Sequence, residues 1–163
     1  MTKKLDNDEL GQLLHLVKGD KFALKLILDM LYIGHAWDDV VDGDVQRSVD
    51  DVNDAFVRMF RDLVNNKFFL SLPLQLQWQL NGLMISAAMQ FRDSTALEVG
   101  SREDRLIGWI LRNSVKAIVH YVVYLAGGSE WIDEHGLAVW KMFRIADDWD
   151  GYWTEGINEN LIR

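Results

Sequence analysis

Two short clusters of aspartate are the residues whose type and spacing could do chemistry. The first is DDVVD, which contains Asp38, Asp39 and Asp42. On a helix, residues three and four apart share a face, so these three carboxylates lie within about one turn of each other. Their mutual repulsion is relieved by a cation, and Mg²⁺ is typically held by one or two carboxylates together with phosphate oxygens and water. The cluster predicts a site for Mg²⁺ or Mn²⁺; the alternative is a solvated acidic helix end, which the helix dipole disfavours.

The second cluster repeats this arrangement near the carboxyl end of the chain. Trp140 and Phe143 precede Asp147 and Asp148 there, just as the leucines of segment 24–31 precede the first cluster. Facing each other, the clusters would hold metal at the mouth of an apolar cavity lined by these large side chains. The predicted metal ligands are Asp38, Asp39, Asp42, Asp147, Asp148 and Glu155, and the predicted catalytic residues are Asp38, Asp39, Asp147 and Asp148.

A basic stripe complements the two acidic clusters. It is formed by Arg105, Trp109, Arg112, Lys116 and His120, which recur at helical spacing. The functional interpretation is that Arg112 or Lys116 faces an anionic ligand held by the metals, with Arg47 and Arg144 as further candidates. The alternative interpretation is that these are surface charges that balance neighbouring acids. Trp140 and Phe143 are expected to contact the apolar part of the same ligand.

The elements that must position these residues are all helices, because no segment shows the alternation of a strand. The expected helices cover residues 7–18, 21–42, 48–64, 73–98, 101–126, and from Ser129 or Asp133 to Asp150. Asp20, Ser48 and Ser101 are expected N-caps, and Asp104 completes a variant of the capping box. The sequence therefore predicts an all-α, single-domain bundle of five or six helices over residues 1–163.

Composition narrows the function further. The net charge of −8 argues against nucleic-acid binding, which needs a basic face. No apolar run is long enough to span a bilayer, and the first residues lack the apolar core of a signal peptide. We expect a soluble, cytoplasmic protein whose partner is a small-molecule diphosphate, and a homo-oligomer is left open.

The first cluster resembles the first aspartate-rich motif of trans-isoprenyl diphosphate synthases and their relatives among the class I terpenoid synthases. That motif is DDxxD followed shortly by two arginines. Asp38, Asp39 and Asp42 match the aspartates, and Arg47 matches the first arginine, while Ser48 replaces the second.

The second cluster is similar to the family's second motif, which reads roughly FQIxDDxxD. The segment FRIADDWDG, residues 143–151, keeps the aromatic residue and Asp147 and Asp148. Arg144 replaces glutamine, and Gly151 replaces the final aspartate. Asp147, Gly151 and Glu155 also fit the looser motif of terpene cyclases. The chain is shorter than these enzymes and lacks their Gly-Lys-Arg segment.

The resemblance implies a reduced terpenoid synthase-like fold with a Mg²⁺ site for a prenyl diphosphate. Two alternatives stay open. One is an all-α nucleotide pyrophosphohydrolase, which also uses acidic helices and Mg²⁺ but favours glutamate. The other is a non-enzymatic helical binding protein, of the kind that a viral genome encodes, in which the acidic clusters bind a partner or only a metal. The sequence leaves open whether the protein is an enzyme, and if it is one, the resemblance implies a transferase or lyase.

Overall fold

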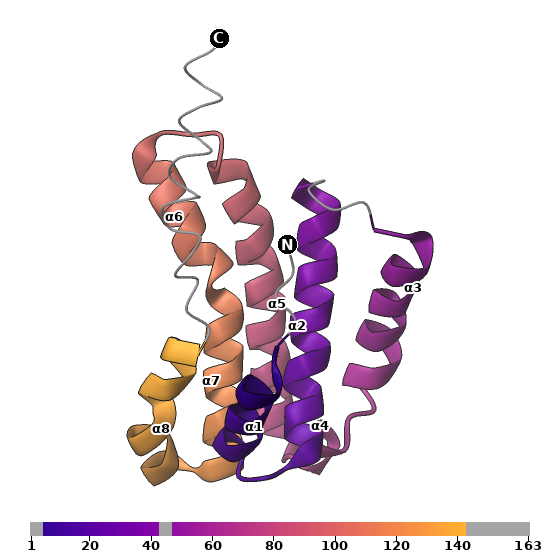
Figure 1. The fold of residues 1–163 in the computed structure, drawn as a ribbon, viewed down its shortest axis with the longest axis vertical. Helices are drawn as coiled ribbons and strands as arrows, with labels where there is room; N and C mark the ends of the chain where they lie inside the picture. The colour runs from indigo at the N-terminus through magenta and orange to yellow at the C-terminus, as the bar shows by residue number, and fades with distance from the viewer. Residues whose placement is uncertain (1–4, 43–46, 143–163) are drawn as a thin grey trace.

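A computed structural model describes residues 5–42 and 47–142, apart from the side chains of residues 41 and 42, and this part of the chain is a bundle of helices (Figure 1). The elements are α1 (Asn7–Leu16), α2 (Lys21–Asp42), α3 (Val49–Val57), the π-helix η1 (Arg58–Leu63), α4 (Lys67–Ser71), α5 (Leu74–Leu97), α6 (Arg102–Arg112), α7 (Ser114–Gly127) and α8 (Ser129–Met142). Because α3 continues into η1 and α6 into α7, the described chain forms six longer rods and one short helix. The all-α prediction of five or six helices is confirmed.

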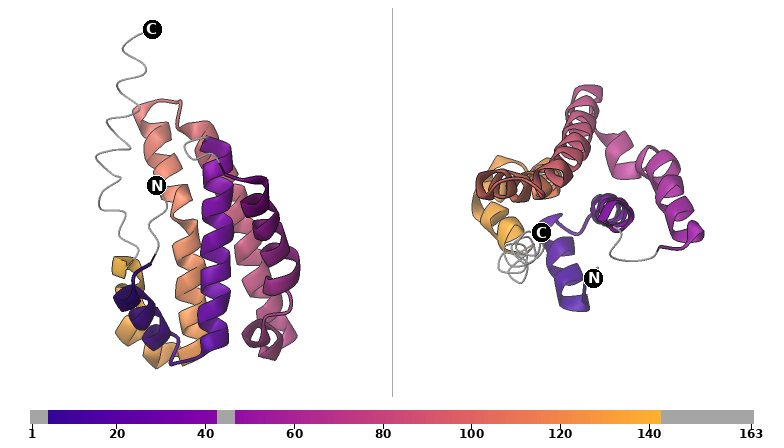
Figure 2. Two further views of the ribbon diagram at one scale, coloured as in Figure 1. Left: turned by 45° about the vertical axis from the view of Figure 1, so that its right-hand side comes forward. Right: turned by 90° about the horizontal axis from the view of Figure 1, so that it is seen from above.

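The long helix α2 lies near the middle of the bundle when it is viewed from above (Figure 2). It contacts α3 and η1 on one side, α7 on another, and α1 and α4 near its beginning. Helices α2, α5 and α8 run in one direction, and α6 and α7 return in the other (Figure 1). The carboxyl end of α8 therefore points toward the end of the bundle where α2 ends.

Local capping explains where the helices begin. The Asp20 carboxylate accepts hydrogen bonds from the backbone N–H groups of Phe22 (2.8 Å) and Ala23 (3.0 Å), which satisfies donors that the first turn leaves open. Ser101 and Asp104 form the predicted capping box at the start of α6. Ser48 forms another at the start of α3. The predicted starts at residues 21 and 129 are also observed.

Two predicted helices are divided. The helix expected over 101–126 breaks at Asn113, whose side-chain amide donates to the backbone carbonyl of Trp109 (2.7 Å) and so competes with the regular helical pattern. The helix expected over 48–64 changes to π-helical geometry at Arg58. The short helix α4 was not predicted; Asn66 caps it by accepting from the Phe69 N–H (3.1 Å), and it also donates to the Phe22 carbonyl (3.0 Å).

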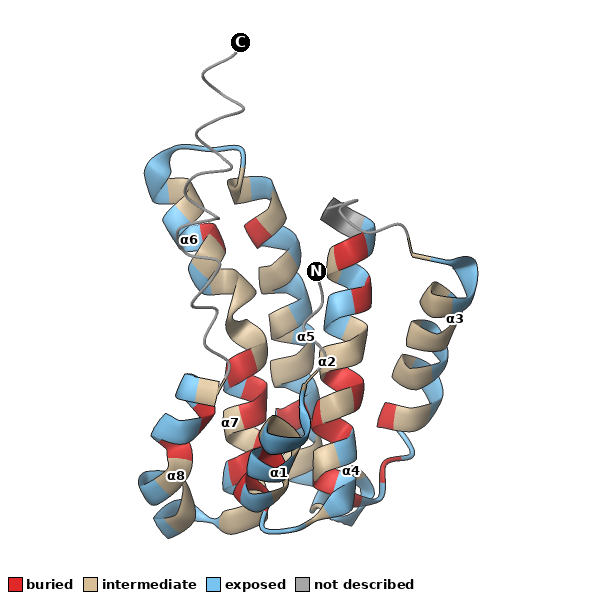
Figure 3. Ribbon diagram, in the orientation of Figure 1, coloured by how far each residue is buried: buried red, intermediate tan, exposed pale blue. Residues whose placement is uncertain are grey.

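The apolar core fills one half of the bundle (Figure 3). Its fully buried members come mainly from α1, α2, α5 and α7 and include Leu13, Leu26, Ile27, Leu80, Val119, Val122 and Val123. Toward the opposite end, where α2 finishes, the buried residues include polar Asp39 and Ser94. Burial of polar groups is costly unless they are paired, and both are paired here, Asp39 with Arg47 and Ser94 with the Phe91 carbonyl. No helix in the described ranges is long and apolar enough to cross a membrane.

Candidate anion-binding site at the end of helix α2

Helix α6 turns its charged face inward. Its arginines Arg105 and Arg112 are half-buried, while its apolar residues Leu106, Ile107 and Ile110 are exposed. An ordinary surface helix shows the opposite arrangement, with the apolar stripe toward the core. The whole predicted basic stripe lies on this inward side, because Trp109 and His120 are half-buried and Lys116 is buried.

Arg112 is a residue of α6 that lies against the first acidic cluster. Its Nη1 lies 3.6 Å from Oδ1 of Asp38, at the end of α2. Its Nη2 forms an ion pair with Glu98, just after α5, and its guanidinium carbon lies 5.4 Å from the ring centre of Phe91. Glu98 was not singled out from the sequence. Arg112 therefore joins the ends of three helices and lies beside Asp38, while its contact with an anionic ligand stays a prediction.

Asp39 is buried and paired with Arg47. The Arg47 Nε donates to the Asp39 carboxylate at 2.6 Å, and the Nη2 of the same guanidinium forms an ion pair with it. Asp39 is 7% exposed. This ion pair connects the end of α2 to the segment that precedes α3, so both residues have a structural role beside the site.

Lys116 lies one turn beyond Arg112 on the same side. It is 9% exposed, and its side-chain ammonium group forms no hydrogen bond or ion pair with the residues that the structure describes. Burial lowers the pKa of its ammonium group, because the charged form loses its contact with water. A buried lysine without a fixed counter-charge is a favourable place for an anion.

His120 and Trp140 continue this face toward α8. Their ring centres lie 5.8 Å apart. Gly136 lets α8 approach, since a Cβ built there would lie 2.7 Å from Nε2 of His120. Trp140 is exposed to solvent. It therefore lies at the edge of the surface that carries Arg112, Lys116 and His120.

Several predicted residues fall outside the described part of the chain. These are Phe143, Arg144, Asp147, Asp148 and Glu155, and the side chain of Asp42. The meeting of the two acidic clusters stays a prediction, and the direction of α8 is compatible with it. The leucines expected to line an apolar pocket, Leu24, Leu28 and Leu31, pack against the core instead.

The described residues of this site include basic side chains that can bind an anion, but they do not form a complete set of metal ligands. Within the described ranges, no group of three His, Asp or Glu side chains is placed to hold a metal ion. The predicted metal ligand Asp39 is instead buried and paired with Arg47, whereas Asp38 is partly exposed. Asp38 fits a site of another kind, in which Mg²⁺ takes one or two carboxylates and completes its ligand set with phosphate oxygens and water. Mg²⁺ would then bind together with the anion.

An apolar hollow lies beside this end of the bundle. It measures about 290 Å³ and is lined by Trp37, Arg92, Thr95 and Ala96. Trp37 directly precedes Asp38 on α2, and Thr95 and Ala96 lie near the end of α5. A charged face with an apolar hollow next to it suits a ligand that has an anionic head and a hydrocarbon part.

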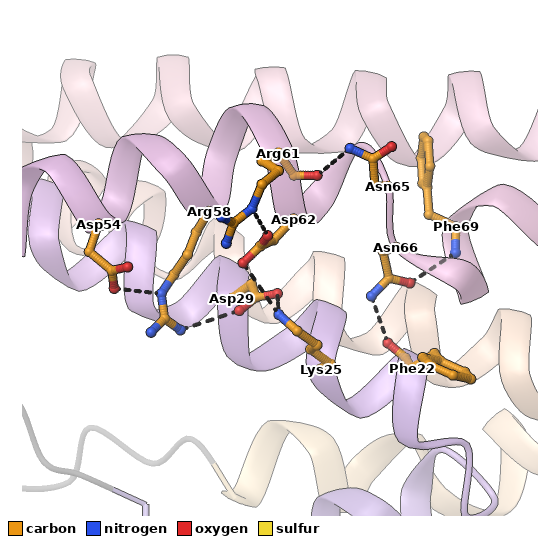
Figure 4. A network of polar contacts seen from close by, with 10 residues as sticks. All are labelled: Phe22, Lys25, Asp29, Asp54, Arg58, Arg61, Asp62, Asn65, Asn66 and Phe69. Carbon is orange, nitrogen blue, oxygen red and sulfur yellow. Dashed lines mark hydrogen bonds and ion pairs between the residues drawn. The ribbon is translucent and has the colours of Figure 1, made fainter.

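A second group of charges, which was not predicted from the sequence, is centred on Asp29 of α2. Asp29 is buried and forms ion pairs with Lys25 and with Arg58, whose Nη1 lies 3.3 Å away; Arg58 also donates to Asp54 at 2.9 Å (Figure 4). The available signal was a carboxylate inside an apolar stretch, four residues after a lysine. The group fastens α2 to α3 and η1, so its role is structural.

The chain was compared with family models, with curated proteins and with solved structures, and none of the three comparisons gave a match. The function is therefore argued from the residues of the site. The resemblance to terpenoid synthases still depends on the aspartate motifs alone.

Proposed function

We propose that the protein binds a diphosphate together with Mg²⁺ or Mn²⁺ at the end of α2, and that it acts on a prenyl diphosphate. One observation carries the proposal: Arg112 of α6 lies 3.6 Å from Asp38 and Lys116 of α7 is buried, while the apolar side chains Leu106, Ile107 and Ile110 of α6 are exposed. An inward lysine or arginine costs stability unless it is paired or binds an anion. Arg112 is paired with Glu98 and contacts Asp38, whereas the ammonium group of Lys116 has no partner among the described residues. A function in anion binding explains why Lys116 lies there, one turn from Arg112.

Each residue has a distinct part in this proposal. Arg112 would exchange its weak contact with Asp38 for a phosphate, to which a guanidinium donates two parallel hydrogen bonds. Lys116 would add a point charge in a poorly hydrated place, where electrostatic interactions are stronger. Asp38 would be freed to hold the metal, while Asp39 keeps its partner Arg47.

The metal would neutralise charge on the departing diphosphate, which is the usual contribution of Mg²⁺ to such chemistry. The protein's own contribution is to orient the diphosphate with Arg112 and Lys116 and to exclude water from it. The apolar hollow next to Trp37 would hold the hydrocarbon part. Asp147 and Asp148 lie outside the described residues, and in this proposal they would supply the remaining carboxylates of the metal site.

The test is calorimetric titration with inorganic pyrophosphate, with and without Mg²⁺. We expect heat of binding only in the presence of the metal, and we expect Arg112→Ala to weaken binding by about 1–3 kcal/mol, the usual loss for a charged hydrogen bond. Arg61→Ala is the matched control, because Arg61 is 69% exposed and lies on η1. Absence of binding under both conditions, or equal losses in the two variants, would exclude the proposal.

The two alternative functions need a second measurement. Release of diphosphate from a prenyl diphosphate supports the synthase-like function, and release of pyrophosphate from a nucleoside triphosphate supports the pyrophosphohydrolase. One observation favours the non-enzymatic binding protein, because Asp38 and Asp39 each contact a guanidinium in the structure. Binding of pyrophosphate without turnover of either substrate would favour that function.

A further inference from the structure

Helix α5 is apolar on two opposite faces. On its inner side Leu80 is fully buried, and Leu83, Met84 and Ala87 pack against the core. On its outer side, four large apolar side chains are exposed. They are Leu74 (58%), Trp78 (68%), Ile85 (55%) and Met89 (51%). A helix that is apolar all round is normally covered on all sides.

The exposed residues, named here the α5 stripe, are Leu74, Trp78, Ile85 and Met89. Their order is symmetric about the peptide bond between Asn81 and Gly82, because Trp78 and Ile85 are equally distant from it, as are Leu74 and Met89. A Cβ built on Gly82 would have no neighbour within 4 Å, so the middle of the stripe is open. Small residues at such a point let two helix backbones approach closely.

We infer that the α5 stripe is the interface through which two copies of this chain form a two-fold symmetric dimer. A two-fold interface uses the same patch on both copies and must be complementary to itself. If the two α5 helices cross in antiparallel orientation at Gly82, Trp78 lies against Ile85 of the partner subunit, and Leu74 lies against Met89 of the partner subunit. The symmetry of the stripe makes each copy complementary to the other.

The charge pattern favours a second copy over a different protein. No residue of α5 from Leu74 to Phe91 is charged, although the chain has 17 basic and 25 acidic residues and a net charge of −8. Two acidic copies repel each other, and an interface without charge keeps that repulsion lowest. The α5 stripe therefore brings no like charges together between two copies, and it offers no charged group that would select a different partner by charge complementarity.

The size of the α5 stripe suits a dimer. From Leu74 to Met89 the helix rises by about 22 Å, at 1.5 Å per residue. Stable interfaces bury about 800 Å² per partner, so the residues beside the stripe would take part in the contact along this length. The exposed apolar residues of α6 are a weaker candidate, because they cover only Leu106 to Ile110 and have Arg102 and Glu103 beside them.

Sedimentation equilibrium of the full chain tests the dimer. We expect the wild type to be a dimer at micromolar concentrations, and we expect Ile85→Glu to raise the dissociation constant by about 100-fold, since the charge is buried at a central position. Ile110→Glu is the matched control: Ile110 is 57% exposed and Ile85 is 55% exposed, and both lie on helices. A monomeric wild type, an Ile85→Glu variant that dimerises as well as wild type, or equal effects of both variants would overturn the inference.

Cysteine cross-linking tests the geometry, because the chain has no cysteine of its own. Under mild oxidation we expect Gly82→Cys to form a disulfide-linked dimer, whereas Gly11→Cys on α1 should not. Trp78→Cys and Ile85→Cys should cross-link when mixed and not when alone. Cross-linking of Trp78→Cys with itself would indicate parallel helices and would contradict the proposed symmetry. Circular dichroism should show unchanged helix content in each variant, because the replaced residues are exposed.

Discussion

The guanidinium of Arg112 on α6 lies 3.6 Å from the carboxylate of Asp38 on α2, so two residues far apart in the sequence face each other across the bundle. Both side chains keep some contact with water, which weakens their attraction. The pair is thus better placed to open for a ligand than to stabilise the fold.

A double-mutant cycle measures how little this pair stabilises the protein. We expect Asp38→Ala, Arg112→Ala and the double variant to give a coupling free energy below about 1 kcal/mol, as for other partly exposed pairs. Urea unfolding followed by circular dichroism supplies the three values. A coupling of several kcal/mol would show that the pair is structural.

Replacing the buried lysine should separate stability from binding. We expect Lys116→Met to stabilise the protein by about 1 kcal/mol at neutral pH, because it removes the cost of burying a charge. The same change should weaken the binding of pyrophosphate. The thermal midpoint and calorimetric titration measure the two effects, and loss of both stability and binding would mean that Lys116 has a partner in the folded state.

The effect of Lys116 also has a definite pH dependence. Burial lowers the pKa of Lys116, so the folded protein binds this proton more weakly than the unfolded chain does. The cost to stability is therefore full at pH values below the folded-state pKa and disappears as pH rises through that pKa toward that of an exposed lysine. The stability difference between wild type and Lys116→Met should shrink over that alkaline range, and a constant difference would argue against a lowered pKa.

Metal binding should stabilise the folded state. We expect Mg²⁺ or Mn²⁺ to raise the thermal midpoint, because a ligand that binds only the folded protein shifts the equilibrium toward it. Asp38→Asn combined with Asp147→Asn should abolish this response and leave the helix content unchanged. A response equal to that of wild type would place the metal site elsewhere.

The buried carboxylate of Asp29 should matter more for stability than the charges of the proposed site. We expect Asp29→Asn to lower the free energy of unfolding by about 2–4 kcal/mol, since it leaves Arg58 and Lys25 without their shared partner. Asp93→Asn is the control, because Asp93 is exposed and pairs only with Arg92 among the described residues. Similar losses in both variants would contradict a structural role for the Asp29 group.

Glycine positions give a test of the packing between α7 and α8. A Cβ on Gly127 would lie 2.1 Å from the ring of Trp131, whose indole N–H donates to the Leu16 carbonyl (2.8 Å), whereas one on Gly34 would meet nothing within 4 Å. We expect Gly127→Ala to destabilise the protein by about 1–3 kcal/mol through overpacking. Gly34→Ala should be neutral or stabilising by up to about 1 kcal/mol, as for glycine inside a helix. Thermal unfolding of the two variants distinguishes these outcomes.

Local sequence was sufficient to determine the helices and most of their ends. The caps Asp20, Ser48 and Ser101 act through hydrogen bonds within three residues, and the helical period of the apolar residues is also local. The break at Asn113 was not predicted, because it accompanies a side-chain bond that competes with the helical pattern. The change to π-helix at Arg58 was not predicted either. Asp29 was missed because its partner Arg58 is distant in sequence.

The sequence by itself thus determined an all-α chain with acidic clusters and one basic stripe, because residue type and helical spacing are properties of short segments. Only the tertiary structure decided that the basic stripe of α6 and α7 faces the interior, since its helical spacing fits an inward and an outward face equally well. It placed Arg112 against Asp38, paired Asp39 with Arg47 and buried Lys116. It also left the α5 stripe uncovered, because α5 contacts its neighbours through only one of its two apolar faces.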